Sequence, residues 1–104
     1  MKNPELIETL QNCAAYCNHC ADASLSEDPI LVACVQKAHA CATVCTATAS
    51  LLAMQYSDTR GMIEYCIKLC KSCTQECEKH DHSHCTKCAK ACRACTDACI
   101  SHLS

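Results

Sequence analysis

The sequence predicts an all-α fold, an antiparallel up-down four-helix bundle with a cysteine-lined core, on three observations. The chain of 104 residues contains 1 Gly and 2 Pro, which is too few for a turn-rich β architecture. Its 15 cysteines recur at steps of three, four or seven residues, the spacing of one helix face. Short polar breaks separate the periodic segments, so consecutive helices are expected to run antiparallel. Because this length suits one domain, residues 1–104 are expected to form a single four-helix-bundle domain.

The first two helices are predicted from their start signals. The first is expected over about residues 4–24, because Asn3 can cap it and a proline in the first turn follows. A polar cluster then interrupts the pattern. The second helix is expected over about residues 29–55, with Asp28 as its cap and Pro29 in its first turn.

The last two helices follow two further polar breaks. The third is expected over about residues 59–79, with Ser57 or Asp58 as its cap. The fourth is expected over about residues 82–102, with Asp81 as its cap.

The cysteines of each predicted helix occupy one stripe, and the charged residues show which way that stripe faces. In the fourth helix, Lys87, Lys90 and Arg93 lie opposite the cysteines. Charged side chains favour water, so the cysteines are expected to face inward. All four stripes then converge on the axis of the bundle.

The composition argues against several classes of protein. The N-terminal residues have no apolar segment of the signal-peptide type, so a cytoplasmic protein with reduced thiols is expected rather than a secreted disulfide scaffold. An odd number of cysteines also prevents complete pairing within one chain. The net charge of −2, without a basic patch, predicts no nucleic-acid binding. No run of 18 apolar residues predicts a membrane span.

A thiol-lined axis is interpreted best as a metal site. Cysteine can fill a core as a small hydrophobe, but Leu or Ala would do so without the risk of oxidation. Thiolates select soft ions, and several four-thiolate zinc sites would each place a charge of about −2 in a dry interior. Cu(I) with bridging thiolates is neutral at one ion per cysteine, which favours multiple Cu(I) ions. The predicted ligands are all fifteen cysteines, namely Cys13, Cys17, Cys20, Cys34, Cys41, Cys45, Cys66, Cys70, Cys73, Cys77, Cys85, Cys88, Cys92, Cys95 and Cys99.

Two alternatives remain open from the residues. One is a zinc or general heavy-metal buffer, which would use the same thiols. The other is a thiol redox protein with one reactive cysteine, for which Cys85 in the first turn of the fourth helix is the candidate. No catalytic residues are predicted, and the protein is not expected to be an enzyme.

The two ends of the predicted bundle differ in composition. One end continues the stripes with Leu6, Leu10, Leu52 and Met62 and is expected to be closed by aliphatic packing. The opposite end is rich in histidine, and imidazole is a good transient ligand for copper. The predicted entrance ligands at that end are His19, His80, His82 and His84.

The second helix has an uncharged outer face. No charged residue occurs between Lys37 and Asp58, and the positions opposite the cysteine stripe carry only small or mildly polar side chains. These positions are Ala40, Thr43, Ala47 and Ser50. Such a face favours contact with another copy of the chain, so a homo-oligomer is expected.

The cysteine spacing resembles that of the bacterial cytosolic copper storage proteins. The resemblance is carried by the segment from Cys73 to Cys92 and its continuation through Cys95 and Cys99. Two earlier segments match the same pattern, Cys13-x3-Cys17-Asn18-His19-Cys20 and Cys34-x6-Cys41-x3-Cys45. The resemblance therefore covers nearly the whole chain.

The resemblance implies a non-catalytic four-helix bundle, commonly assembled as a tetramer, that holds many Cu(I) ions through cysteine thiolates along its core. Copper ions, with a copper donor or acceptor, are then the expected partners. The sequence departs from fuller members of the family at Leu6 and Leu10, where further thiols would fit, and at Ala38, which interrupts the second stripe.

Overall fold

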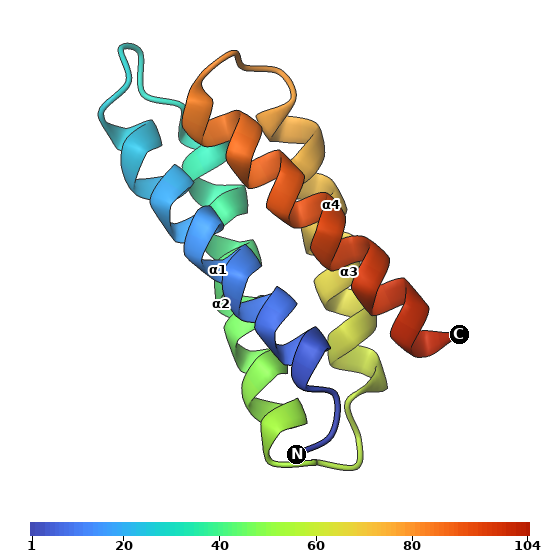
Figure 1. Cartoon of the computed structure of the whole chain (residues 1–104). Coiled ribbons are helices and arrows are strands. Elements are labelled where there is room, and N and C mark those ends of the chain that lie inside the picture. The colour runs from blue at the N-terminus through green and yellow to red at the C-terminus, as the bar shows by residue number, and fades with distance from the viewer.

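The computed structural model describes all 104 residues as an up-down bundle of four helices (Figure 1). The helices are α1 (Pro4–Leu25), α2 (Val32–Ala53), α3 (Arg60–Cys77) and α4 (Ser83–Leu103). Each helix packs against two others, so that α1 and α3 both contact α2 and α4. The molecule measures 44 × 21 × 19 Å, as expected for helices that lie side by side along one axis. The predicted all-α bundle is therefore confirmed.

The start of α2 differs from the prediction. The helix begins at Val32, and Pro29 lies in the preceding turn rather than in the first helical turn. The backbone N–H of Leu31 donates to the carbonyl of Ser24 at 3.2 Å, which closes this turn before the helix starts. The prediction of Asp28 as the cap of α2 was wrong, because Leu31 occupies the N-cap position.

The other predicted caps are also only partly correct. Asn3 does occupy the N-cap of α1, but its backbone is left-handed, with φ at 56°, and its side chain forms no cap hydrogen bond. The predictions of Ser57 or Asp58 as the cap of α3 and of Asp81 as the cap of α4 were wrong, because Thr59 and His82 occupy these N-cap positions. Since no helix has a side-chain cap, the helix starts depend on packing rather than on capping.

All fifteen cysteines face the bundle axis and are at most 1 % exposed. Alanines complete the interior, among them Ala38, which is fully buried in the stripe of α2 where a thiol is missing. The helical period of the cysteines thus predicted the buried face of every helix correctly. A core of thiols and methyl groups has little aliphatic surface, so its larger side chains matter more for stability.

The two ends of the bundle have different side chains. The histidine end, at the top of Figure 1, joins α1 to α2 and α3 to α4 and contains His80, His82 and His84. The leucine end, opposite, is closed by large buried side chains, namely Leu6, Ile7, Leu10, Leu52 and Ile63. Met62 was predicted among the side chains that close this end, and this prediction was wrong by one residue. Ile63 is 1 % exposed, whereas Met62 is only half-buried.

The outer face of α2 is open to solvent at all four of its predicted positions, which are Ala40, Thr43, Ala47 and Ser50. None of the four helices is both long enough and apolar enough to traverse a lipid bilayer.

Candidate metal centre on the bundle axis

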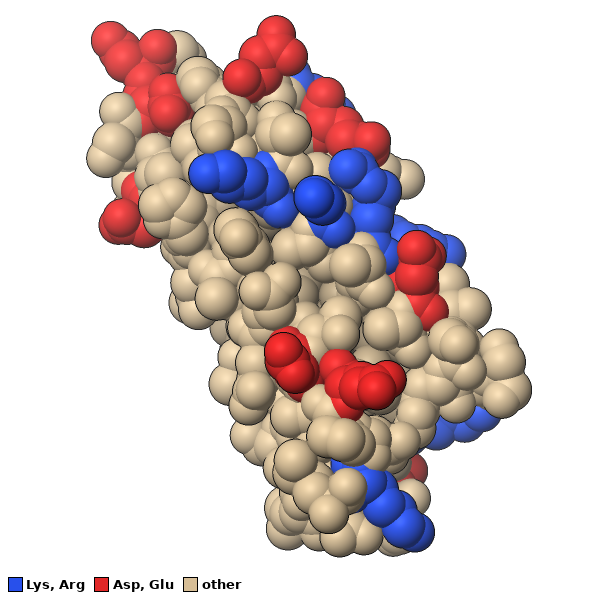
Figure 2. Space-filling model, in the orientation of Figure 1, with Lys and Arg blue, Asp and Glu red and all other residues tan.

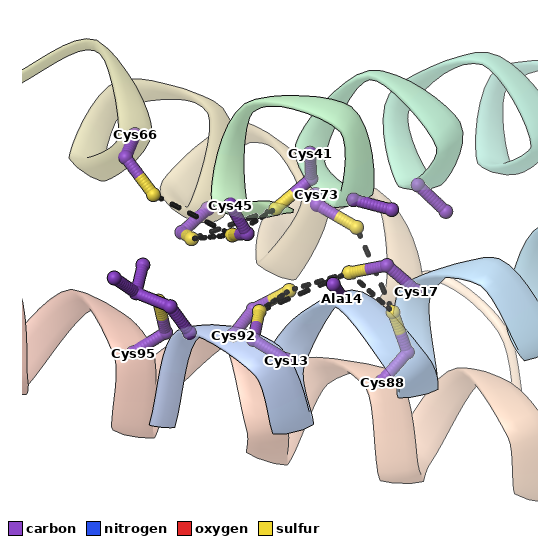
Figure 3. Packing of buried hydrophobic residues seen from close by; sticks show 14 of the residues in the cluster. Cys13, Ala14, Cys17, Cys41, Cys45, Cys66, Cys73, Cys88, Cys92 and Cys95 are labelled. Atoms are coloured by element: carbon purple, nitrogen blue, oxygen red, sulfur yellow. Dashed lines mark hydrogen bonds between the residues drawn. The ribbon is translucent and has the colours of Figure 1, made fainter. Parts of the chain in front are cut away.

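Thiols from α1, α3 and α4 form a connected group near the middle of the axis (Figure 3). The Sγ atom of Cys17 lies 3.5 Å from that of Cys92 and 3.7 Å from that of Cys88. Cys13 Sγ lies 3.8 Å from Cys92 Sγ and 3.9 Å from Cys17 Sγ. Cys73 extends the group, with its Sγ atom 3.7 Å from that of Cys88. Three helices therefore contribute sulfur to one continuous cluster.

Thiols from α2 and α3 form a second group nearer the leucine end. Cys45 Sγ lies 3.4 Å from Cys66 Sγ and 3.9 Å from the Sγ atoms of Cys41 and Cys70. Cys41 and Cys70 are themselves 3.5 Å apart at sulfur. Figure 3 shows Cys41, Cys45 and Cys66 pointing toward the axis from the ribbons of α2 and α3.

Sets of four thiols link the two groups. Sets whose sulfur atoms all lie within 4.8 Å of one another include Cys13, Cys17, Cys41 and Cys92; Cys13, Cys45, Cys70 and Cys95; and Cys17, Cys73, Cys88 and Cys92. Cys13 belongs to the first two sets, and Cys17 and Cys92 belong to the first and third. A shared thiolate can bridge two metal ions, so the sets form one linked array rather than separate sites.

The sulfur spacings identify the chemistry that the array can support. The contacts run from 3.4 to 4.0 Å, far beyond the disulfide bond length of about 2.05 Å, and all fifteen thiols are free. With a Cu–S bond of about 2.2 Å, slightly below Zn–S, two sulfurs lie about 4.4 Å apart in a linear site and about 3.8 Å apart in a trigonal one. The observed spacings suit trigonal, bridged Cu(I) rather than a linear site, but a tetrahedral zinc site with Zn–S of about 2.3 Å would also place its sulfurs about 3.8 Å apart. The choice between the two metals therefore depends on charge rather than on spacing.

Burial controls the ionisation of two thiols near the histidine end, those of Cys34 and Cys85. It raises the pKa of Cys34 to about 11, because the thiolate is poorly solvated there, and it also raises the pKa of Cys85. These thiols are therefore protonated at neutral pH, and a bound metal ion must displace their protons. A redox protein with a reactive Cys85, the alternative left open from the sequence, would need a depressed thiol pKa, whereas burial raises the pKa of Cys85 and favours its neutral form.

The histidine end brings one predicted imidazole into contact with the thiols. His84 Nδ1 lies 3.3 Å from Cys20 Sγ and 3.5 Å from Cys85 Sγ, and the three ligand atoms form a potential metal-binding group. A further group, formed by the three thiols of Cys20, Cys77 and Cys88, shares Cys20 with it. His84 thus connects the surface to the sulfur array.

Two carboxylates hold the histidines at this end. Glu27, in the turn between α1 and α2, accepts a hydrogen bond from His84 Nε2 at 3.1 Å, and its other carboxylate oxygen lies 3.4 Å from His82 Nε2. Glu76 accepts one from His80 Nε2 at 3.2 Å. His19 is exposed on α1 and has no hydrogen bond to a thiol. Sequence reasoning missed both carboxylates, although the spacing of Glu76 and His80, four residues apart on one helix face, was a readable signal.

Glu76 is the one buried acidic side chain, and cations surround it. Its carboxylate lies 3.3 Å from Lys79 Nζ and 3.6 Å from Lys37 Nζ, so it ties the end of α3 to α2. Burial opposes ionisation of Glu76, but hydrogen bonds from His80 and Lys79 and the charge of Lys37 outweigh that effect and hold its pKa below the ordinary value.

Solved structures with the same fold contain copper. The Cu(I)-bound copper storage protein BsCsp3 is 32% identical with a TM-score of 0.91, over 96% of each chain. The copper storage protein Ccsp from Streptomyces lividans, loaded with 10 copper equivalents, is 40% identical with a TM-score of 0.91, over 95% of this chain and 81% of that one. A cytosolic copper storage protein from Streptomyces lividans with five coppers is 40% identical with a TM-score of 0.90, over 94% of this chain and 88% of that one.

Sequence comparisons agree with the structural ones. The cysteine-rich protein YhjQ of Bacillus subtilis (strain 168) is 34% identical over 81 residues, which are 76% of this chain and 75% of that protein. The family model of the copper storage proteins matches residues 1–104. With its fifteen buried thiols facing the bundle axis, this chain belongs to the copper storage protein family.

Proposed function

We propose that this protein stores multiple Cu(I) ions along its axis, bound by the thiolates of its fifteen cysteines. The observation that carries the proposal is the linked array of four-thiol sets, whose sulfur contacts of 3.4 to 4.0 Å suit bridged trigonal Cu(I). BsCsp3 with Cu(I), and the Streptomyces lividans structures with five and ten coppers, provide the precedent.

Charge balance favours Cu(I) over zinc as the cargo. Each Cu(I) that binds a thiol releases one proton to solvent and leaves a neutral copper–thiolate unit. The array can therefore fill without accumulating charge in the buried interior. A four-thiolate zinc site keeps a net charge of about −2, and linked sites of that kind would repel one another at low dielectric.

The path of copper into the core follows from the order of the ligand groups. We infer that His19, His80, His82 and His84 act as entrance ligands at the histidine end. Copper then passes to Cys20 and Cys85, next to the set formed by Cys20, Cys77 and Cys88, and from there to the central four-thiol sets. Each successive group shares a thiol with its neighbour or lies beside it, so an ion moves by exchange of ligands.

Several broader properties belong to the same proposal. The protein acts as a store rather than as a catalyst, and it works in the cytoplasm, as the description of the Streptomyces lividans protein suggests for that relative. It exchanges copper with a donor or acceptor. It also assembles with further copies, as a tetramer in line with the family resemblance, through the uncharged outer face of α2.

Titration of the reduced, full-length chain with Cu(I) under anaerobic conditions, against a chromogenic Cu(I) chelator, tests the storage proposal. The expected capacity is near one ion per cysteine, or about 15 equivalents. Saturation at about one to four equivalents would refute storage and indicate discrete sites. Added Zn(II) should be displaced by Cu(I), and retention of zinc would favour the heavy-metal buffer.

A paired substitution locates the bound copper. Cys17→Ser with Cys92→Ser removes two thiols shared between four-thiol sets and should lower the capacity by at least two equivalents. Thr96→Ser, at a buried α4 position without sulfur, is the matched control and should leave the capacity unchanged.

A further inference from the structure

One carboxylate at the histidine end contacts two imidazoles. Glu27 Oε1 lies 3.1 Å from His84 Nε2, and Glu27 Oε2 lies 3.4 Å from His82 Nε2. The two rings are stacked, with centroids 5.4 Å apart and planes inclined by 2°. Glu27 is 57 residues from His84 in sequence, so the α1–α2 turn reaches across the bundle to the start of α4.

The partners of His84 determine which of its nitrogens carries the proton. An ionised carboxylate can only accept hydrogen bonds, so the neutral ring must carry its hydrogen on Nε2, facing Glu27. The Nδ1 lone pair is then left facing Cys20 Sγ at 3.3 Å and Cys85 Sγ at 3.5 Å. The His84 side chain is only 10 % exposed, so the ring has little freedom to leave this orientation.

We propose that Glu27 is a positioning residue for copper uptake: it fixes the tautomer and orientation of His84, so that Nδ1 completes a preformed Cys20–Cys85–His84 site for the first incoming Cu(I) ion. Metal-bound histidines commonly donate their other ring N–H to a carboxylate, which also makes the imidazole a better ligand. This inference rests on the proposed function, and it assigns to Glu27 a role that its place in a turn does not suggest.

The ring of His82 extends this arrangement of carboxylate and imidazole toward solvent. His82 is more exposed than His84, yet its Nε2 lies 3.4 Å from the same carboxylate and its ring stacks on that of His84. Glu27 therefore holds an outer and an inner imidazole as a pair. An ion captured by the outer ring meets an inner ring that is already oriented toward the thiols.

The test compares Glu27→Ala and Glu27→Gln with Asp28→Asn in the full-length reduced protein. Asp28 is the adjacent exposed carboxylate and has no ion pair, so its substitution removes the same charge without touching either histidine. The ¹⁵N NMR signals of the His84 ring in the apo-protein report the tautomer, and stopped-flow transfer from a Cu(I)–chelator complex reports the rate of uptake. Total capacity and the thermal midpoint of the apo-protein are measured in parallel.

We expect Glu27→Ala to weaken the bias toward the Nε2–H tautomer to the intrinsic preference of a histidine side chain and to slow uptake of the first equivalents about tenfold, without a change in capacity. Glu27→Gln, whose amide oxygen can still accept from one ring, should restore part of the bias and part of the rate. Asp28→Asn should match the wild type in both measurements.

An unchanged tautomer in Glu27→Ala would overturn the proposal. Equal slowing of copper uptake in Glu27→Ala and Asp28→Asn would also overturn it. The slower uptake would then reflect only the negative charge lost at the histidine end. Failure of the storage function is distinguishable, since a low wild-type capacity would leave the tautomer result in the apo-protein intact.

Discussion

The two ends of the bundle belong to the same four helices but differ in what their side chains can do. The leucine end is sealed by aliphatic groups such as Leu10, which is fully buried. The histidine end has imidazoles and carboxylates that link the surface to Cys20 and Cys85. Acidic side chains also gather there, as the upper part of Figure 2 shows, and negative potential attracts cations.

This difference separates two requirements that conflict in a metal store. A stable core needs buried aliphatic surface, while an accessible one needs polar ligands and room for ligand exchange. Thiols supply only small apolar groups, so large side chains are concentrated where metal does not have to pass. Stability and access are therefore provided at opposite ends of one axis.

The largest expected effect concerns stability at the leucine end. Leu10→Ala should destabilise the apo-protein by about 2–5 kcal/mol, because it opens a cavity in the only part of the core with large aliphatic side chains. Chemical denaturation followed by far-UV circular dichroism measures this change. Ile100→Ala, at a residue of α4 that is 43 % exposed, is the control and should change stability by less than about 0.5 kcal/mol.

The same variant also tests whether the leucine end is closed to copper. Leu10→Ala should take up and release copper at the wild-type rate. Faster uptake in this variant would mean that metal passes through the leucine end, and the assignment of the two ends would then be wrong.

The next effect concerns copper exchange at the histidine end. Replacing His80, His82 and His84 together by Ala should slow loading and removal of copper by about ten- to a hundredfold, while capacity stays the same. The imidazoles act as stepping ligands, whereas the thiolates retain the ions. Stopped-flow transfer to and from a chelator gives both rates. A triple variant that exchanges copper at the wild-type rate would contradict the entrance assigned to this end.

Much of this architecture could be predicted from the sequence because the cysteines mark their own helix face. Steps of three and four residues determined the inward stripe of each helix, and burial of all fifteen thiols confirms it. The side chains that close the leucine end were predicted less well. Met62 and Ile63 lie four and three residues before Cys66, and both spacings suit the helix face of that cysteine. Only packing distinguishes them.

Contacts made by the turns could not be predicted in the same way. Glu27 reaches His84 from a segment without periodicity, and no spacing rule relates positions 57 residues apart. The start of α2 was misplaced for a related reason, since Pro29 is equally suited to a turn and to a first helical turn. Local signals therefore determined the helices, and the tertiary structure determined how the turns close the histidine end.

The smallest effect compares one carboxylate from each end. Glu76, at the histidine end, is 9 % exposed at its side chain and has three cationic or imidazole partners, whereas Glu64, at the leucine end, is 58 % exposed and pairs only with Arg60. Glu76→Gln should lower the stability of the apo-protein at pH 7 by up to about 1 kcal/mol, since the partners Lys37 and Lys79 are 41 % and 65 % exposed at their side chains and solvent screens their charges. Glu64→Gln, a pair on the surface of one helix, should have an effect close to zero.

The pH dependence distinguishes a charge effect at Glu76 from a packing effect. The pKa of Glu76 is below its ordinary value in the folded protein, so its contribution is present above the unfolded-state pKa, 4.5, and is lost as the pH falls through the folded-state pKa. Urea denaturation at pH 7 and at pH 3 should therefore show the Glu76→Gln difference shrinking toward zero in acid. A difference of the same size at both pH values would indicate lost packing, and the carboxylate could not then be what ties α3 to α2 through Lys37 at the end where copper enters.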